Sequence, residues 1–243
     1  KGLANRHGEY LQAIPTLKHF CANNTENERG TASSDVDMRT LNEYYYAAFE
    51  RPVTSGGAYS VMAAYNELSG VPAVINPDIQ KVLKDRWGLG FVVTDGGDFS
   101  QNVTFHEYSE SHAETIALAI KNGTDVMTDC EDVVEAAVFE ALNSGLVSEK
   151  DIDKALYNSL LARFRLGEFD EKHPFSDVCE MMIDNEEHKC LNRRAALEQM
   201  VLLRSSDILP IYDECSMAVV GMNGNCNLMD WYTGYSSYNT TIF

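Results

Sequence analysis

The stretch that decides the fold is FVVTDGG, residues 91–97. Its first four residues are apolar or β-branched, which predicts a short buried strand over Phe91–Thr94. Asp95 follows this strand, and two glycines after it allow a ligand to approach the backbone closely. Asp-Gly is also a common turn signal, so Asp95 has two interpretations at this point, a turn residue or a catalytic carboxylate.

Three more strands are expected on either side of this one. The apolar pattern predicts them over Leu11–Leu17, Ala58–Ala64 and Thr124–Met127. Helices are predicted between and after the strands, over residues 38–51, 77–87, 111–121, 131–143 and 148–166. Strands that alternate with helices indicate βαβ units and a parallel sheet, so we expect an α/β fold.

Polar or charged residues end each predicted strand, as is typical where active-site groups project from the carboxyl ends of parallel strands. A doubly wound sheet has the same alternation, but no G-x-G-x-x-G sequence follows any strand, which argues against a dinucleotide-binding module. Four strands are too few to close an eight-stranded barrel. Residues 1–170 are therefore expected to form half of a TIM-type (β/α)8 barrel.

Beyond Phe169 the composition changes. Residues 171–212 are predicted to be an acidic linker and a connecting helix over residues 188–204. Residues 213–243 are expected to start a second α/β domain, with Met217–Gly221 as its first strand.

The composition restricts the classes of partner. The formal net charge of −18 argues against binding to nucleic acid or to anionic membranes. No apolar run approaches the roughly 18 residues of a membrane span. The six cysteines show no metal-ligand spacing, which predicts free thiols, no metal site and no cofactor. Residues 1–10 lack the apolar core of a signal peptide, so a cytoplasmic location is favoured.

Two other strand ends carry groups with functional potential. Lys18 and His19 follow the first predicted strand, and Tyr65 follows the second. Taken alone, each has a structural interpretation: a surface lysine, a buried histidine with a protein partner, and a packed aromatic ring whose hydroxyl finds an acceptor.

The order of these pieces along the chain is more specific than any one of them. The sequence closely resembles glycoside hydrolase family 3, and within it the β-xylosidase and β-glucosidase branches. The matching stretches cover nearly the whole chain: KHF at 18–20, NN at 23–24, ENER at 26–29, GAYSVMAAYNELSGVP at 57–72, WG at 87–88, VVTD at 92–95, GTD at 123–125, GLVS at 145–148, ARFRLG at 162–167 and HK at 188–189.

The resemblance implies a fold and a set of roles. The chain would be the second half of the (β/α)8 barrel, about its last four βα units, and the start of an α/β sandwich domain. Asp95 would be the nucleophile of a retaining β-glycosidase that hydrolyses terminal non-reducing β-linked xylose or glucose. Tyr65 would support the nucleophile, and Lys18 and His19 would donate hydrogen bonds to hydroxyls of an oligosaccharide or glycoside substrate.

The sequence departs from the family pattern at several points. Most members place the acid/base glutamate in the sandwich domain, so we expect this residue outside the chain. Gly96 and Asp98 replace the usual residues beside the nucleophile, which leaves the choice of sugar open. His106 matches the xylosidase-like branch and is a candidate substrate contact. The alternative function is a sugar-binding remnant that lacks its acid, and the linkage and the oligomeric state also stay open.

Overall fold

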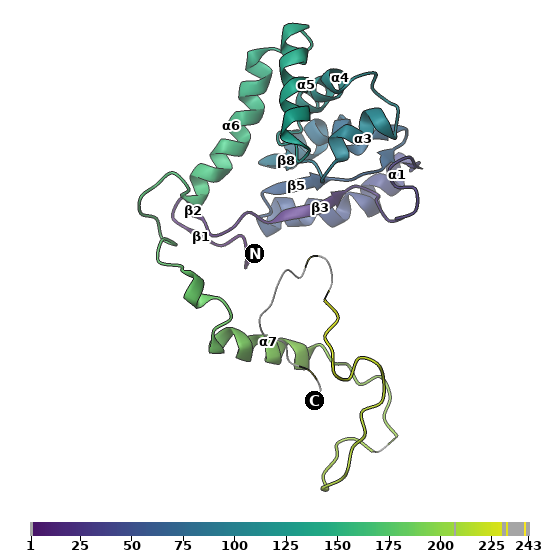
Figure 1. Cartoon of the computed structure of the whole chain (residues 1–243), viewed down its shortest axis with the longest axis vertical. Coiled ribbons are helices and arrows are strands. Elements are labelled where there is room, and N and C mark those ends of the chain that lie inside the picture. Colours follow the sequence, from purple (N-terminus) through teal and green to yellow (C-terminus); the bar gives the residue numbers. More distant parts are fainter. Residues whose placement is uncertain (1, 207, 230–231, 233–240, 242–243) are drawn as a thin grey trace. The chain divides into compact units, whose positions relative to one another are not determined.

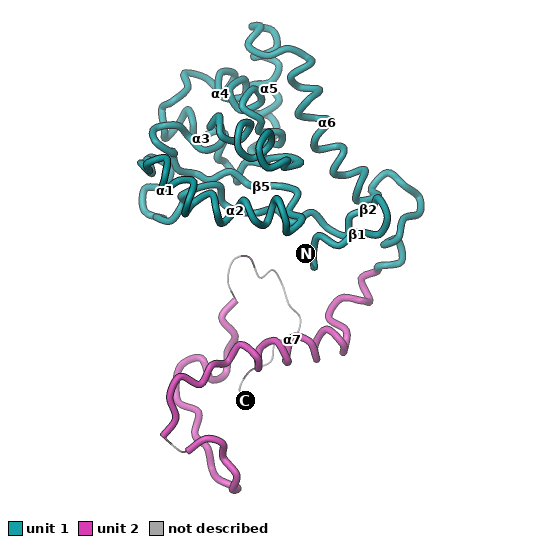
Figure 2. Tube along the Cα trace, turned by 180° about the vertical axis from the view of Figure 1, so that it is seen from behind, with its two compact units in different colours: residues 1–178 teal, residues 179–243 magenta. Residues whose placement is uncertain are grey.

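The computed structural model describes residues 2–206, 208–229, 232 and 241. The chain forms two compact units, residues 1–178 and residues 179–243 (Figure 2). In the described part, every strand belongs to unit 1. Unit 1 therefore contains the sheet and the candidate site.

A three-stranded parallel sheet forms the centre of unit 1. Its order is β3 (Thr16–Phe20), β5 (Ser60–Ala63) and β8 (Phe91–Val93), and helical segments connect the strands (Figure 1). Ser60 pairs with Thr16 on one side and with Phe91 on the other. The prediction of an α/β fold with a parallel sheet is confirmed.

The first strand lies further along the chain than predicted. β3 begins at Thr16, directly after Pro15, and includes Lys18 and His19. Pro15 has no N–H to contribute to the sheet, but its carbonyl accepts the N–H groups of Tyr59 and Ser60 at 3.3 and 3.4 Å. Leu11, at the start of the predicted strand, lies instead in a small hairpin formed by β1 (Arg6–His7) and β2 (Tyr10–Leu11).

The fourth predicted strand is reduced to a single bridge. Val126 pairs in parallel with Val93, and no longer ladder forms over residues 124–127. Side chains add to the backbone hydrogen bonds of this bridge: Thr128 donates its N–H to Oγ1 of Thr94 at 2.9 Å and its hydroxyl to the Thr94 carbonyl at 2.7 Å. The segment therefore still runs beside the end of β8.

Most helices occupy the predicted ranges because local sequence signals set their ends. α4 (His112–Lys121) begins after Ser111, whose hydroxyl accepts the N–H of Glu114. A capping box between Ser148 and Asp151 starts the last long helix of unit 1, and Gly167 ends it with a φ of 81°. The helices η4 (Ile79–Arg86), α5 (Glu131–Asn143) and α6 (Glu149–Leu166) agree with the prediction.

The first helical segment is longer than predicted. It runs through α1 (Met38–Thr40), η1 (Leu41–Tyr45), α2 (Ala47–Arg51) and η2 (Pro52–Gly56), with some wider turns in which residue i+5 donates to residue i. The N–H of Tyr46, for example, donates to the Leu41 carbonyl at 2.8 Å. Pro52 is tolerated because it stands at the start of a new turn, and Gly57, with a φ of 84°, ends the segment.

A further helix lies between Asp95 and α4, where none of the predicted helices falls. α3 spans Asp98–Thr104, and its free N–H groups at Phe99 and Ser100 donate to the carboxylate of Asp129 at 3.2 and 3.0 Å. The cap comes from a segment about 30 residues away, so the local sequence does not contain it.

A second, smaller sheet holds the loops that follow β3 and β5. It contains β4 (Ser33–Ser34), β6 (Glu67–Leu68) and β7 (Val71–Pro72), followed by the short η3 (Ala73–Ile75). Asn66 joins these loops, because its amide nitrogen donates to the Cys21 carbonyl at 3.3 Å and to Oγ of Ser34 at 3.2 Å.

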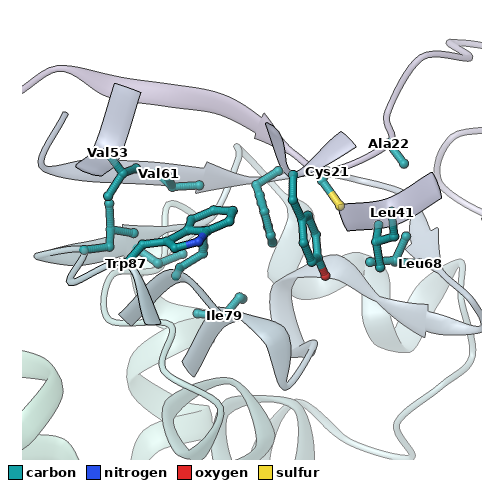
Figure 3. Close-up of a cluster of buried hydrophobic side chains, with 13 residues drawn as sticks. Cys21, Ala22, Leu41, Val53, Val61, Leu68, Ile79 and Trp87 are labelled. Atoms are coloured by element: carbon teal, nitrogen blue, oxygen red, sulfur yellow. The ribbon is translucent and has the colours of Figure 1, made fainter. Parts of the chain in front are cut away.

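The largest hydrophobic cluster packs the first helical segment and η4 against the sheet (Figure 3). Its buried members include Val61 from β5 and Trp87 from the end of η4. The Phe20 ring stacks on Tyr46 at 5.4 Å and meets Trp87 edge-on at 6.5 Å. This packing fixes the end of β3 and therefore the position of His19.

Unit 2 contains η5 (Glu180–Met182) and α7 (Glu186–Glu198), which starts and ends earlier than the predicted helix. Residues 217–221 are not in a strand, so that prediction is wrong for this structure. A strand needs the hydrogen bonds of a neighbouring strand, and the described residues of unit 2 offer none. Residues 213–243 are predicted to begin the second domain. Within this segment, residues 230–231, 233–240 and 242–243 lie outside the described residues.

Candidate active site

The carboxyl ends of the three parallel strands bring three of the predicted site residues together. His19 lies in β3, Tyr65 lies two residues after β5, and Asp95 lies two residues after β8. Nε2 of His19 is 2.9 Å from Oδ2 of Asp95. The hydroxyl of Tyr65 donates to the carbonyl of Gly96, next to Asp95, at 2.7 Å.

The contact between His19 and Asp95 lies within ion-pair distance, but the ring N–H is not aligned for a hydrogen bond to the carboxylate. Both side chains keep some access to solvent, with exposed fractions of 23% and 16%. Burial lowers the pKa of His19, against the opposite effect of Asp95, and Lys18 and Arg29 lower it further. The imidazole is therefore neutral at pH 7, with one ring N–H to donate.

Tyr65 is held as a neutral phenol beside the carboxylate. Burial, followed by the charge of Asp95, raises the pKa of Tyr65 to about 12. Its hydroxyl is therefore a donor throughout the physiological range. The guanidinium of Arg29 lies over the Tyr65 ring, 4.4 Å from its centroid, and also pairs with Glu26 at 2.9 Å. The loop after β3 is thereby attached to the candidate site.

Lys18 precedes His19 in β3, and its side chain is exposed. Its charge is close enough to lower the pKa of His19. Its role toward a substrate stays a prediction.

His106 has a different environment from the other candidates. Its side chain is fully buried, with one ring nitrogen 3.1 Å from Glu67 and the other 2.8 Å from the Tyr65 carbonyl. Both nitrogens thus have protein partners, and the ring joins the loop after α3 to the hairpin that follows β5. The predicted substrate contact is untested, and this geometry favours a structural role.

Two acidic residues at the site were not predicted to have functional roles. Asp98, at the start of α3, is almost completely buried, and Asp129 caps the same helix. The sequence gives no signal for Asp98, because its position in the first turn of α3 is known only from the structure. No group of three or more possible metal-ligating side chains occurs among the described residues.

A hollow of about 400 Å³ lies away from these groups. It is lined by residues at the starts of β3 and β5 and by the end of the first helical segment, such as Pro15, Leu17, Pro52 and Ala58. None of the candidate residues lines it. The strand ends therefore define the candidate site.

Curated relatives match most of the chain. It is 30% identical to a probable exo-1,4-β-xylosidase of Aspergillus clavatus, over 95% of this chain and 31% of that protein. It is 36% identical to a β-glucosidase of Rhizobium radiobacter, over 86% of this chain and 24% of that protein. The chain thus spans about a quarter to a third of the length of these relatives. No family model matches it.

Solved structures give the same result for the fold. A GH3 exo-β-xylosidase in complex with a xylobiose aziridine probe superposes with a TM-score of 0.78 at 26% identity, over 85% of this chain and 28% of that chain. A β-glucosidase from Erythrobacter marinus gives a TM-score of 0.77 at 29% identity, over 86% of this chain and 29% of that chain. The resemblance to glycoside hydrolase family 3 is confirmed.

Proposed function

We propose that this chain forms the nucleophile-bearing part of a retaining β-glycosidase that removes terminal β-linked xylose or glucose from the non-reducing end of a glycoside. The observation that carries the proposal is the meeting of His19, Tyr65 and Asp95 at one edge of the parallel sheet. The relatives and solved structures named as β-xylosidases and β-glucosidases support it.

In this mechanism Asp95 attacks the anomeric carbon while the glycosidic C–O bond breaks and the acid/base group protonates the leaving oxygen. Water, deprotonated by the same acid/base group, then hydrolyses the covalent glycosyl-enzyme and releases the sugar and the Asp95 carboxylate. The oxocarbenium-like transition state is stabilised by a carboxylate beneath it. Tyr65 is a neutral donor that fixes the turn at Gly96 and so the position of Asp95. Lys18 and His19 donate hydrogen bonds to the sugar hydroxyls.

We also propose the architecture that this chemistry requires. Residues 1–170 form the C-terminal half of a (β/α)8 barrel, which fits the order β3, β5, β8 of strands that are consecutive βα units. Residues 171–212 connect it to an α/β sandwich domain that begins at 213–243. A retaining pair needs a second carboxyl about 5–5.5 Å from the first, and the resemblance to glycoside hydrolase family 3 implies that this acid/base group comes from outside this chain.

The substrate proposal also fits the net charge of the chain. A net charge of −18 repels polyanions and leaves neutral sugars as ligands. No helix in the described part combines the length and the apolar character needed to cross a bilayer.

Covalent trapping in the full-length protein tests the proposal. A 2-deoxy-2-fluoro-β-xyloside or β-glucoside with a good leaving group should label the peptide that contains Asp95, because the fluorine slows hydrolysis of the intermediate more than its formation. Asp95→Asn should abolish labelling and most of kcat. Asp153→Asn, an exposed carboxylate on α6, is the matched control and should leave both unchanged.

Hydrolysis of aryl glycosides separates an active enzyme from a sugar-binding remnant that lacks its acid. An intact enzyme hydrolyses aryl glycosides with both good and poor leaving groups, whereas a remnant hydrolyses only those with good ones. Labelling of Asp98 or Asp125 in place of Asp95 would contradict the assignment of the nucleophile.

A further inference from the structure

Asp98 is a buried carboxylic acid beside the candidate nucleophile. Its exposed fraction is 1%, and its N–H donates to the Asp95 carbonyl at 3.2 Å, which closes the turn between β8 and α3. Among the described residues, its Oδ2 has no hydrogen-bond partner.

A second oxygen without a partner lies one helical turn further along α3. Oδ1 of Asn102 is also buried and has no donor in the described part, while the Asn102 amide nitrogen already donates to the carbonyls of Asp98 and Phe99. Residues i and i+4 lie on the same face of a helix. A buried acceptor without a donor is costly, and the cost is larger when the acceptor is charged, so burial favours the protonated form of Asp98.

The charges around Asp98 act in the same direction. Burial, followed by the negative charges of Asp129 and Asp95, raises the pKa of Asp98 well above its usual range, against a smaller opposite effect of the Asp95 backbone N–H. The other titratable groups packed near this turn are Tyr65, which is a neutral phenol, and His112 of α4, whose ring lies against Phe99 at 5.5 Å.

The partners of Asp129 differ from those of Asp98. The two carboxylate oxygens of Asp129 accept the N–H groups of Phe99 and Ser100 at the start of α3. Oδ2 of Asp98 has no such donor in the described part, and a buried carboxyl group beside negative charges is favoured in its neutral form.

We propose that Asp98 is a positioning residue for the nucleophile Asp95: its protonated, buried carboxyl group holds the turn from β8 to α3 and keeps a second negative charge away from Asp95. The role rests on the proposed function. Asp98 does not touch the substrate, because its side chain is buried. When Asp98 ionises, an uncompensated charge is buried at this turn and Asp95 gains a charged neighbour, so activity falls at alkaline pH.

The first test measures stability and does not depend on activity. A carboxyl group with a raised pKa in the folded state binds more protons than in the unfolded chain above about pH 4, so wild-type stability falls as the pH rises. Asp98→Asn has the same shape without this titration. The unfolding constant of the wild type relative to Asp98→Asn should therefore increase up to about tenfold per pH unit above pH 4. Parallel stability curves from pH 4 to pH 8 would overturn the proposal.

The second test measures the pH dependence of kcat/KM on an aryl β-xyloside or β-glucoside in the full-length protein. Asp98→Asn should keep activity at pH 6 and shift the alkaline loss to higher pH. Asp129→Asn retains an acceptor for the N–H groups of α3 but removes the negative charge that favours the proton on Asp98. It should therefore shift the alkaline loss of activity to lower pH. Three coincident profiles would refute the positioning role. Labelling of Asp95 tests the proposed function separately, so the two proposals can fail independently.

Discussion

The buried ion pair between Lys84 and Asp125 offers a quantitative test of the fold. Nζ of Lys84 lies 2.7 and 2.6 Å from the two oxygens of Asp125, with side-chain exposed fractions of 8% and 2%. Asp125 also accepts the Val92 N–H at 2.8 Å and the Asn158 amide at 2.9 Å. One carboxylate therefore joins η4, β8 and α6.

Removing this carboxylate leaves a buried cation without a partner. Burial lowers the pKa of Lys84 more than Asp125 raises it, so the ammonium group is poorly compensated even in the wild type. Breaking a buried pair in this way costs about 3–5 kcal/mol. At about 2–4 °C per kcal/mol for a domain of this size, Asp125→Ala should lower Tm by about 6–20 °C.

Two matched variants test whether the unpaired, buried Lys84 causes the decrease in Tm. Lys84→Met keeps the length of the side chain and leaves Asp125 with its two other donors. Its decrease in Tm should therefore be smaller than that of Asp125→Ala. Glu43→Gln breaks the exposed pair between Arg39 and Glu43, with exposed fractions of 82% and 65%, and should cost less than about 1 kcal/mol. Thermal unfolding followed by circular dichroism measures all three. Equal losses for Asp125→Ala and Glu43→Gln would refute the reasoning.

Three further predictions concern the site. Lys18→Ala should raise the pKa of His19, because the ammonium charge of Lys18 lowers it. As the pH is decreased, kcat/KM of this variant should then begin to fall at a higher pH than in the wild type. An unchanged acidic side of the pH profile would contradict this. His19→Ala should lower kcat as well as weaken binding, since contacts with sugar hydroxyls strengthen toward the transition state; a change in KM alone would show that His19 holds only the ground state. His106→Ala should lower Tm, with a loss of about 1–3 kcal/mol for the half-buried Glu67 carboxylate and Tyr65 carbonyl that it leaves unpaired; a normal Tm with a raised KM would favour the substrate contact.

Much of the fold could be predicted from the sequence because its signals are local. The ends of α4 and α6 follow from Ser111, Ser148 and Gly167, which act within one or two turns of their own helix. The buried strand at β8 follows from four consecutive residues. The strand predicted at 217–221 failed for the opposite reason, since strands depend on partners.

For the candidate site too, part could be predicted from the sequence and part could not. Asp95, His19 and Tyr65 could be proposed from the order of short motifs, and a parallel sheet implies that strand ends meet at one edge. The distances between them, and the raised pKa of Tyr65, depend on burial that no short motif contains.

By itself, the sequence determined the alternation of strands and helices and the identity of the groups at the strand ends, because these depend on neighbours within a few residues. Only the tertiary structure decided that α3 exists, that Asp129 caps it and that Asp98 is buried without side-chain donors. These facts need the segment after Val126 to lie against the end of β8, about 30 residues away in the chain. The physical reason is that burial and charge are properties of the packed environment, so the protonation of a carboxyl group is set by the segments that surround it.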